Sequence, residues 1–378
     1  MNDAQLYYLS AKILAMDFVE SHKASIISDL STKEISWTKW IKLCDKHLVL
    51  QAMHSQLLRH DLLGHFPSEI IEHLKMVHDL NKKRNDEIVR QVHSINALLN
   101  AKNIYPVYFK GVGNILDNLY PDPAQRIFLD IDFLVAEKDW EKSAEILKLN
   151  GYESSYTYKP ELRDSLKHYP RLYIDHQPGV IEIHRLAIPD KYKKHISTNE
   201  VLKHKRHPEL TDLCFVMSLE HMAIQNFIHS QLQHKSHLYA RTFLRNLYDL
   251  LVISKKVDVF DVLSRYKGYP RKAAGYLDIF QRSFSLPAKS YPKPSLYLHL
   301  FSARYHAVLK PGPIKYINFF FAYFSHIIMR KVFISYIQLP ILALFKKNKR
   351  QYLTERFKDP NIIKKQLRVL TNLVKGKR

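Results

Sequence analysis

The sequence is poor in the residues that mark disulfide-rich, zinc-binding or disordered proteins. It has two cysteines, Cys44 and Cys214, and nine glycines among 378 residues. Two cysteines so far apart in sequence provide neither a disulfide framework nor a Cys-x2-Cys metal cage. We therefore expect reduced core thiols in a cytosolic protein. The scarcity of glycine, and the lack of long Gly/Ser-rich or Pro-rich runs, argue against a disordered protein and against a loop-rich all-β protein.

A basic leader followed by an apolar run is also missing. Residues 1–5 carry no basic cluster, and the acidic Asp17 and Glu20 interrupt the segment that follows. We therefore expect no secretory signal. The predicted location is the cytoplasm, with contact to the inner face of a membrane as an additional possibility.

Acidic residues are scarce in the last third of the chain. The net charge is +22 overall, but +20 of it comes from residues 261–378, whereas residues 101–190 sum to −3. A metal site needs carboxylates, and a surface that faces a polyanion needs Lys and Arg. The acidic segment is therefore where we look for chemistry, and residues 310–378 are a candidate contact for RNA or a membrane surface.

Long apolar runs are absent as well. The aromatic stretch that begins at Phe319 is divided by His326, Arg330 and Lys331, and Pro340 interrupts its second part. A membrane span needs about 20 mostly apolar residues. We therefore predict a buried helix pair here. A helix pair lying at a lipid interface and a true span are the alternatives.

What is present predicts an α+β protein with a small mixed β-sheet core embedded between N- and C-terminal helical segments. The apolar fraction of 46% is enough for a sizeable core. The predicted segments are a helical segment at 1–100, an α/β core at 101–190, a second helical segment at 191–285 and a basic, aromatic-rich helical segment at 286–378. Hydrophobic periodicity and turn residues predict these elements: a long helix from Ser68, with 81–87 as an exposed face or a short break; strands at 105–109 and 128–135; a turn at 110–113 that opens a helix at 114–119; a helix at 139–149; a strand pair at 171–176 and 180–188; helices at 213–227 and 242–252; and a linker near 285–295.

The clearest chemical feature is Asp130-Ile131-Asp132. Carboxylates at positions i and i+2 of a strand point to the same side, while Ile131 and Phe133 point to the other. Two carboxylates so close together repel each other unless a cation lies between them. Mg²⁺ prefers carboxylate oxygens and completes its shell with water and phosphates, so this pair is a candidate metal site, with Mn²⁺ as the alternative ion.

Two further features lie on either side of this pair. Lys110-Gly111 joins a strand to a helix, and such a turn presents backbone N–H groups to an anion, although an ordinary turn would look the same. Glu182 and His184 share one face of an apolar strand. A buried carboxylate there needs a partner, which is either a metal or a basic side chain such as Arg126.

Together these motifs resemble the polymerase-β-type nucleotidyltransferase superfamily, and more closely an uncharacterised bacterial nucleotidyltransferase family. The resemblance covers roughly residues 35–260. Its motifs in order are Trp37, Arg84-Asn85, Lys110-Gly111, Tyr120-Pro121, Arg126, Asp130-Ile131-Asp132-Phe133-Leu134-Val135, Gly151-Tyr152, Glu182-Ile183-His184, His221 and Asp249.

The resemblance implies an enzyme that moves an NMP from an NTP to a hydroxyl or phosphate acceptor and releases pyrophosphate. Two Mg²⁺ ions would be held by Asp130, Asp132 and Glu182, which are also the implied catalytic residues. Lys110, Gly111 and Arg126 would bind the nucleotide.

Three more residues have supporting roles in this hypothesis. His184 would orient Glu182 or simply pack, and His221 and Asp249 would line the acceptor side or serve as helix contacts. The NTP is not identified, with ATP among the candidates, and the acceptor is a small molecule, a protein or a tRNA. The alternative is an inactive core whose basic C-terminal third binds RNA or an anionic membrane.

Overall fold

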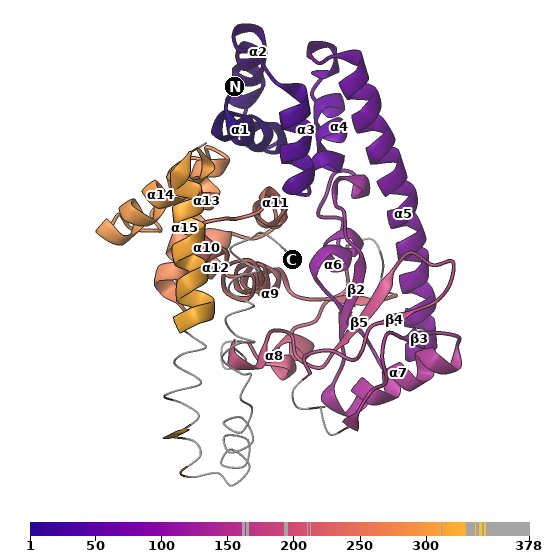
Figure 1. The fold of residues 1–378 in the computed structure, drawn as a ribbon. Helices are drawn as coiled ribbons and strands as arrows, with labels where there is room; N and C mark the ends of the chain where they lie inside the picture. Colours follow the sequence, from indigo (N-terminus) through magenta and orange to yellow (C-terminus); the bar gives the residue numbers. More distant parts are fainter. Residues whose placement is uncertain are drawn as a thin grey trace, which may run out of the picture. The chain divides into compact units, whose positions relative to one another are not determined.

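The computed structural model describes residues 1–329, except for 161, 162, 164, 165, 193–195, 210, 212 and 311, together with the isolated positions 337, 340, 341 and 344. The chain divides into two compact units, Met1–Lys315 and Tyr316–Arg378. The first unit contains the sheet and nearly all the described helices (Figure 1). The four predicted segments do not correspond one-to-one to these units, and they remain a prediction.

Five helices form the N-terminal part, as the sequence predicts: α1 (Asp3–Leu14), α2 (Ser21–Thr32), α3 (Trp37–Lys46), α4 (Leu50–Arg59) and α5 (Ser68–Asn100). The long helix α5 follows Pro67, whose fixed φ suits a helix start. Its apolar residues recur at helical spacing and are fully buried, namely Leu74, Ile88, Val92, Ile95 and Leu99. In Figure 1, α5 runs past α4 at one end and past the sheet at the other.

Residues 81–87 form no break in this helix. The predicted exposed face is confirmed for Lys82, Lys83 and Asp86 but wrong for Asn81 and Asn85. The helix is continuous, and Asn81 and Asn85 are buried. Both donate side-chain hydrogen bonds to the carbonyl of Arg126, at 3.3 and 2.9 Å. The two amides thus provide hydrogen bonds to a buried backbone oxygen in the loop that leads into the site. This contact explains why the helix carries polar residues on a buried face.

A six-stranded mixed sheet forms the core, in the order β3-β4-β5-β2-β1-β6. The described strands are β1 (Val107–Tyr108), β2 (Asp130–Leu134), β3 (Glu153–Ser154), β4 (Leu172–Tyr173), β5 (Val180–His184) and β6 (Phe215–Val216). β2 lies between β1, which is antiparallel to it, and β5, which is parallel to it. The predicted α+β class and the embedded sheet are confirmed.

The sheet separates an apolar face from a polar face. Ile131, Phe133, Ile181 and Ile183 are fully buried on β2 and β5. They lie toward α5 and α7 (Trp140–Leu149), since the Trp140 indole donates to the Ile183 carbonyl at 2.9 Å. The alternating residues on these strands, which include Asp132 and Glu182, point to the opposite side, where the start of α6 (Lys110–Leu116) lies against β2.

Several element boundaries differ from the predictions. Helix α6 (Lys110–Leu116) begins at the residues expected to form a turn and ends before Leu119. Within 213–227, which was predicted to be helical throughout, β6 precedes α9 (Leu219–Phe227) because it pairs with β1 at the sheet edge. The edge strand β3 was not predicted; its two residues have no apolar alternation that would reveal it.

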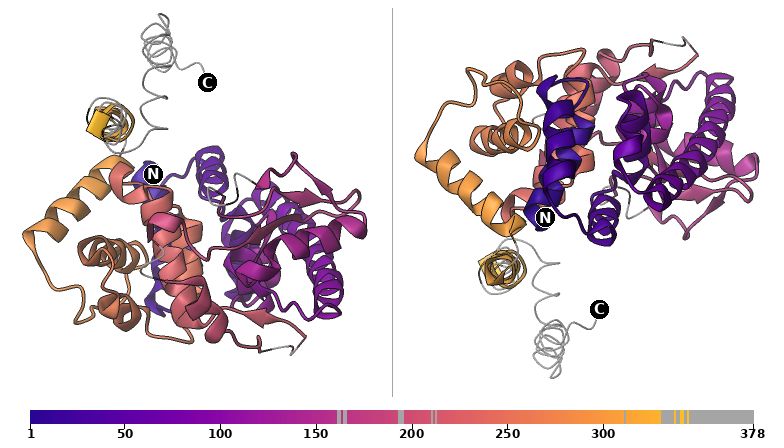
Figure 2. Two further views of the ribbon diagram at one scale, coloured as in Figure 1. Left: turned by 90° about the horizontal axis from the view of Figure 1, so that it is seen from below. Right: turned by 90° about the horizontal axis from the view of Figure 1, so that it is seen from above.

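The helices after the sheet complete the first unit: α8 (Thr198–Lys203), α9, a π-helical turn (Ile228–Gln233), α10 (Ser236–Tyr239), α11 (Leu244–Ile253), α12 (Val259–Arg265), α13 (Pro270–Ser283) and α14 (Leu296–Leu309). In Figure 2, α13 and α14 lie on one side of the indigo α1, and the sheet lies on the other. The predicted linker matches the non-helical segment between α13 and α14.

The aromatic stretch of α15 (Pro313–Tyr323) is exposed where it is described. Phe319, Phe320 and Phe321 are 57%, 59% and 64% exposed, so the predicted burial is wrong for these side chains. Most of residues 330–378 lie outside the described part. Within the described residues, no helix is long and apolar enough to cross a membrane.

Candidate active site

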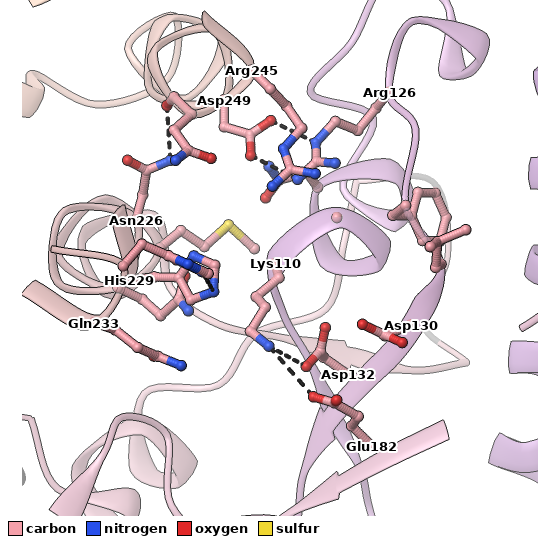
Figure 3. A pocket seen from close by; sticks show the side chains of 18 of the residues that line it. Lys110, Arg126, Asp130, Asp132, Glu182, Asn226, His229, Gln233, Arg245 and Asp249 are labelled. Carbon is pink, nitrogen blue, oxygen red and sulfur yellow. Dashed lines mark hydrogen bonds and ion pairs between the residues drawn. The ribbon is translucent and has the colours of Figure 1, made fainter. Parts of the chain in front are cut away.

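The carboxylates of the site come from two neighbouring strands. Asp132 on β2 pairs in register with Glu182 on β5, so their side chains stand next to each other on the polar face of the sheet. Asp130 lies two residues before Asp132 and therefore on the same face. Both Asp132 and Glu182 are buried, at 4% and 5% exposure, whereas Asp130 is half-buried. Figure 3 shows the three carboxylates grouped at one end of a cavity.

Lys110 places an ammonium group directly on these acids. It is the first residue of α6 and has a left-handed φ of 57°, a backbone conformation that a non-glycine residue rarely adopts and that costs energy. Its Nζ donates a short hydrogen bond to Asp132 Oδ1 and lies 3.7 Å from Glu182 Oε2. The strained start of α6 therefore directs a cation to the place where the sequence analysis expects a metal.

His184 lies on the strand of Glu182 and is completely buried. Its Nε2 is 2.7 Å from Asp132 Oδ1 and 3.4 Å from Glu182 Oε2. Its Nδ1 is buried without a hydrogen-bond partner in the described part of the chain. Burial is the main cause that lowers the pKa of His184 to about 4. A neutral imidazole with Nε2 protonated would donate to the carboxylates and hold them in position.

Arg171, on the loop before β4, provides a second cation. Its Nη2 is 2.7 Å from Glu182 Oε1 and 3.6 Å from Asp130 Oδ2. The guanidinium is about half exposed, so it can leave the acids at low cost. The sequence pattern predicts a strand at this residue but no role in the site.

The local charges shift the pKa values of the two aspartates in opposite directions. Burial by itself raises the pKa of both carboxyl groups. For Asp130 the nearby Glu182 and Asp132 add to this effect, so its pKa is raised. For Asp132 the ammonium of Lys110 and the hydrogen bond from His184 outweigh burial, so its pKa is lowered. Of the two aspartates, Asp130 therefore has less compensating positive charge near it, and an added cation would favour its charged form.

Gly111 has a packing reason to be glycine. A Cβ at this position would lie 2.7 Å from the Cβ of Phe128. The absence of a side chain lets the first turn of α6 lie against the segment that leads into β2. Gly111 also lines the cavity, which agrees with its predicted place beside the nucleotide but does not test that role.

Arg126 and Asp249, which the sequence analysis treated separately, form a buried ion pair. Arg126 Nε is 2.7 Å from Asp249 Oδ1, and Arg126 Nη2 is 2.9 Å from Asp249 Oδ2. Tyr120 also donates to Asp249 Oδ1 through a short hydrogen bond. The pair lies in the wall of the cavity, across from the carboxylates (Figure 3). His221 is not among the residues that line this cavity, and its Nδ1 is 3.1 Å from Ser218 Oγ.

The cavity that joins these groups has a volume of about 510 Å³. Beyond the predicted residues, the side chains that line it include Lys167, Arg171, Asn226, His229, Gln233 and Arg245. One signal in the sequence could have pointed to some of them. Asn226, His229 and Gln233 recur at helical spacing, which is the pattern of a polar stripe along one face of a helix.

Asp132, Glu182 and His184 offer ligand atoms that all lie within 4.8 Å of one another. Two hard carboxylates and an imidazole suit a divalent cation, and the carboxylates already attract Lys110 and Arg171. Acidic residues on a sheet beside a helix start are the arrangement expected for the nucleotidyltransferase class.

Comparison with known families agrees with this class. The family model described as uncharacterised nucleotidyltransferase matches residues 33–266, more than half of the chain. The chain therefore belongs to this nucleotidyltransferase family, and membership implies a nucleoside triphosphate substrate. No curated protein matches the sequence.

Proposed function

We propose that the protein is a metal-dependent nucleotidyltransferase that moves an NMP from an NTP to a hydroxyl or phosphate acceptor and releases pyrophosphate. The observation that carries the proposal is the direct pairing of Asp132 with Glu182 on adjacent parallel strands. Asp130 is on the same face, and all three open into one cavity. Membership of the nucleotidyltransferase family supports it.

In this proposal, two Mg²⁺ ions bind to Asp130, Asp132 and Glu182, with Mn²⁺ as a substitute. The donor set fits, because Asp132 and Glu182 offer ligand atoms within 4.8 Å of each other and Asp130 lies on the same face. Burial, followed by the charges of Glu182 and Asp132, raises the pKa of Asp130. When bound, the ions would polarise the α-phosphate and make the acceptor hydroxyl more acidic. Lys110 and Arg171 now lie on these carboxylates, so both would turn toward phosphate oxygens when substrate and metal arrive.

The chain's own residues would supply positioning and electrostatics, which dominate catalysis of phosphoryl transfer. Lys110 would bind oxygens of the triphosphate. Gly111, which has no side chain, would let the phosphates approach the backbone closely. His184, held against Phe109 with ring centroids 4.9 Å apart, would keep Asp132 and Glu182 in one orientation. Arg126 lies on the side of the cavity opposite the carboxylates and would neutralise phosphate charge there. Its ion pair with Asp249 would hold the guanidinium in one orientation.

The test is to incubate the purified chain with Mg²⁺ and each NTP in turn and to measure pyrophosphate release in the presence of a lysate as the acceptor source. We expect release with at least one NTP and a loss of about a hundredfold or more in the Asp130→Ala/Asp132→Ala variant. Asp175→Ala is the matched control, since Asp175 is an exposed aspartate between β4 and β5. Release that persists in the double variant would reject the assignment.

A further inference from the structure

Arg245, near the start of α11, forms no ion pair of its own with a carboxylate among the described residues, and the Asp249 charge that acts on it is already paired with Arg126. Its Nε is buried and has no hydrogen-bond partner within the described residues, and no described carboxylate lies within ion-pairing distance of its guanidinium. It lines the cavity beside the Arg126–Asp249 pair (Figure 3). Since Arg126 already occupies both oxygens of Asp249, one positive charge remains in excess at this wall.

The surroundings make this charge costly. Burial, and next to it the positive charge of Arg126, lower the pKa of Arg245 to about 10. A protein normally pairs a cation that is largely removed from water. A destabilised, unpaired arginine that points into a cavity is the arrangement expected of a site prepared for an anion.

The adjoining helix adds neutral donors to the same wall. Helix α9 passes into a π-helical turn at Ile228–Gln233, a feature that occurs often at functional sites. It brings His229 and Gln233 to the cavity beside Lys110 (Figure 3). His229 Nε2 lies 3.1 Å from His234 Nε2. Burial and then the charge of Lys110 keep the pKa of His229 well below its usual range, so it is neutral and can donate one hydrogen bond.

We propose that Arg245, His229 and Gln233 form an anion subsite that binds a phosphate group of a substrate, on the helical wall opposite the carboxylates. A guanidinium holds phosphate oxygens with paired, charge-assisted hydrogen bonds, and the imidazole and amide N–H groups complete the contact. The subsite deepens the proposed function and rests on it for the identity of the substrate. Its two possible occupants, the terminal phosphates of the NTP and a phosphate on the acceptor, share this chemistry.

The test measures calorimetric binding of inorganic tripolyphosphate to the full chain without divalent metal, so it requires no turnover. We expect Arg245→Met to weaken the affinity about tenfold or more, with Arg245→Lys intermediate and His229→Asn weaker than the native chain. Arg271→Met and His299→Asn are the matched controls, because both residues are exposed and lie on α13 and α14. Native affinity in Arg245→Met, or an equal loss in Arg271→Met, would overturn the subsite.

A second arm distinguishes the two occupants. A non-hydrolysable Mg·NTP analogue is titrated first, and inorganic phosphate is then titrated onto the saturated protein. If the NTP tail occupies the subsite, Arg245→Met weakens the analogue and the saturated protein binds no phosphate. If an acceptor phosphate occupies it, analogue affinity is unchanged and phosphate still binds in an Arg245-dependent manner. Both results support the subsite, whereas no dependence on Arg245 in either titration contradicts it.

Thermal unfolding separates a binding role from a structural one. Since Arg245 is an unpaired charge, Arg245→Met should raise the unfolding midpoint of the ligand-free protein by about 1–3 °C, whereas loss of a structural contact would lower it. Failure of the proposed function would appear differently, as absent pyrophosphate release with Arg245-dependent tripolyphosphate binding intact.

Discussion

Lys110 Nζ lies between the carboxylates of Asp132 and Glu182, the two acids that face each other across β2 and β5. The ammonium group thus compensates part of the negative charge of the acids. Its position depends on a left-handed backbone at the start of α6. One side chain therefore connects the strained strand–helix junction with the acidic cluster, and it competes with any cation for the same oxygens.

This competition predicts an unusual result for Lys110→Met. Without the ammonium, Mg²⁺ or Mn²⁺ should bind the free protein about fivefold more tightly or better, since one charge–charge interaction at this distance is worth about 1 kcal/mol even in water. NTP affinity should fall, because the ammonium that we propose binds the phosphates is lost. Calorimetric titration of Mn²⁺ and then of NTP measures both, with Lys102→Met, at an exposed position, as the control. Weaker metal binding in Lys110→Met would contradict the competition.

The buried pair of Arg126 and Asp249 should contribute strongly to stability when only one partner is removed. Arg126→Met leaves Asp249 buried with only the Tyr120 hydroxyl as a partner among its side-chain contacts described above. The expected loss is about 3–5 kcal/mol in the free energy of unfolding. Urea unfolding of Arg126→Met, Asp249→Leu and the double variant forms a double-mutant cycle. The double variant should be more stable than Arg126→Met; strict additivity would mean that the two side chains are not coupled.

Gly111→Ala should destabilise the start of α6. The new Cβ would meet Phe128 Cβ at 2.7 Å, and such overpacking costs about 1–3 kcal/mol, partly offset by the better helix propensity of Ala. Gly64→Ala is the control, because nothing lies within 4 Å of a Cβ added there. The midpoint of urea unfolding should therefore fall for Gly111→Ala and stay within error for Gly64→Ala. Equal midpoints for the two variants would show that the Phe128 side chain moves away from the new Cβ without a measurable loss of stability.

His47 should make the fold sensitive to acid. Burial, followed by the charges of Lys46 and Arg241, lowers the pKa of His47 to about 3, and its Nδ1 accepts a hydrogen bond from the Leu244 N–H at 3.2 Å. The unfolded chain takes up a proton near pH 6.5, but the folded His47 does not. Its contribution to stability is therefore fully present above pH 6.5 and falls by about 1.4 kcal/mol per pH unit as pH drops toward 3.

The measurement for this prediction is urea unfolding at a series of pH values between 7 and 4. His47→Asn keeps a hydrogen-bond acceptor without titrating, so the slope of stability against pH should decrease by about one proton. His299→Asn, at an exposed position, should leave the slope unchanged. A slope in His47→Asn equal to that of the native chain would show that His47 takes up its proton in the folded state.

Much of the fold follows from local patterns. Helix α5 was predicted from its apolar stripe, and β2 and β5 from alternation, because burial of one face leaves a periodic record in the sequence. Hydrophobic periodicity does not predict the burial of Asn81 and Asn85. An amide that satisfies a buried carbonyl has the same polarity as one that faces water, so periodicity alone placed them on an exposed face or at a break.

The short elements show the same limit. β6 has two residues and exists because the chain returns to pair with β1. Such a strand is too short to carry an alternating pattern, and the residues around it read as part of the helix that follows. Its assignment required knowledge of a partner strand more than a hundred positions earlier in the sequence.

The sequence alone determined which residue types were available for chemistry: two aspartates on one strand face, a glutamate and a histidine on another, and a lysine before a glycine. It also determined the family, since those motifs occur in a specific order. Tertiary structure decided the rest. The register of β2 against β5 placed Asp132 beside Glu182. The packing of α11 placed Asp249 on Arg126 and left Arg245 Nε without a hydrogen-bond partner among the described residues. Pairing between distant segments depends on shape and burial in the folded chain, which no local pattern records.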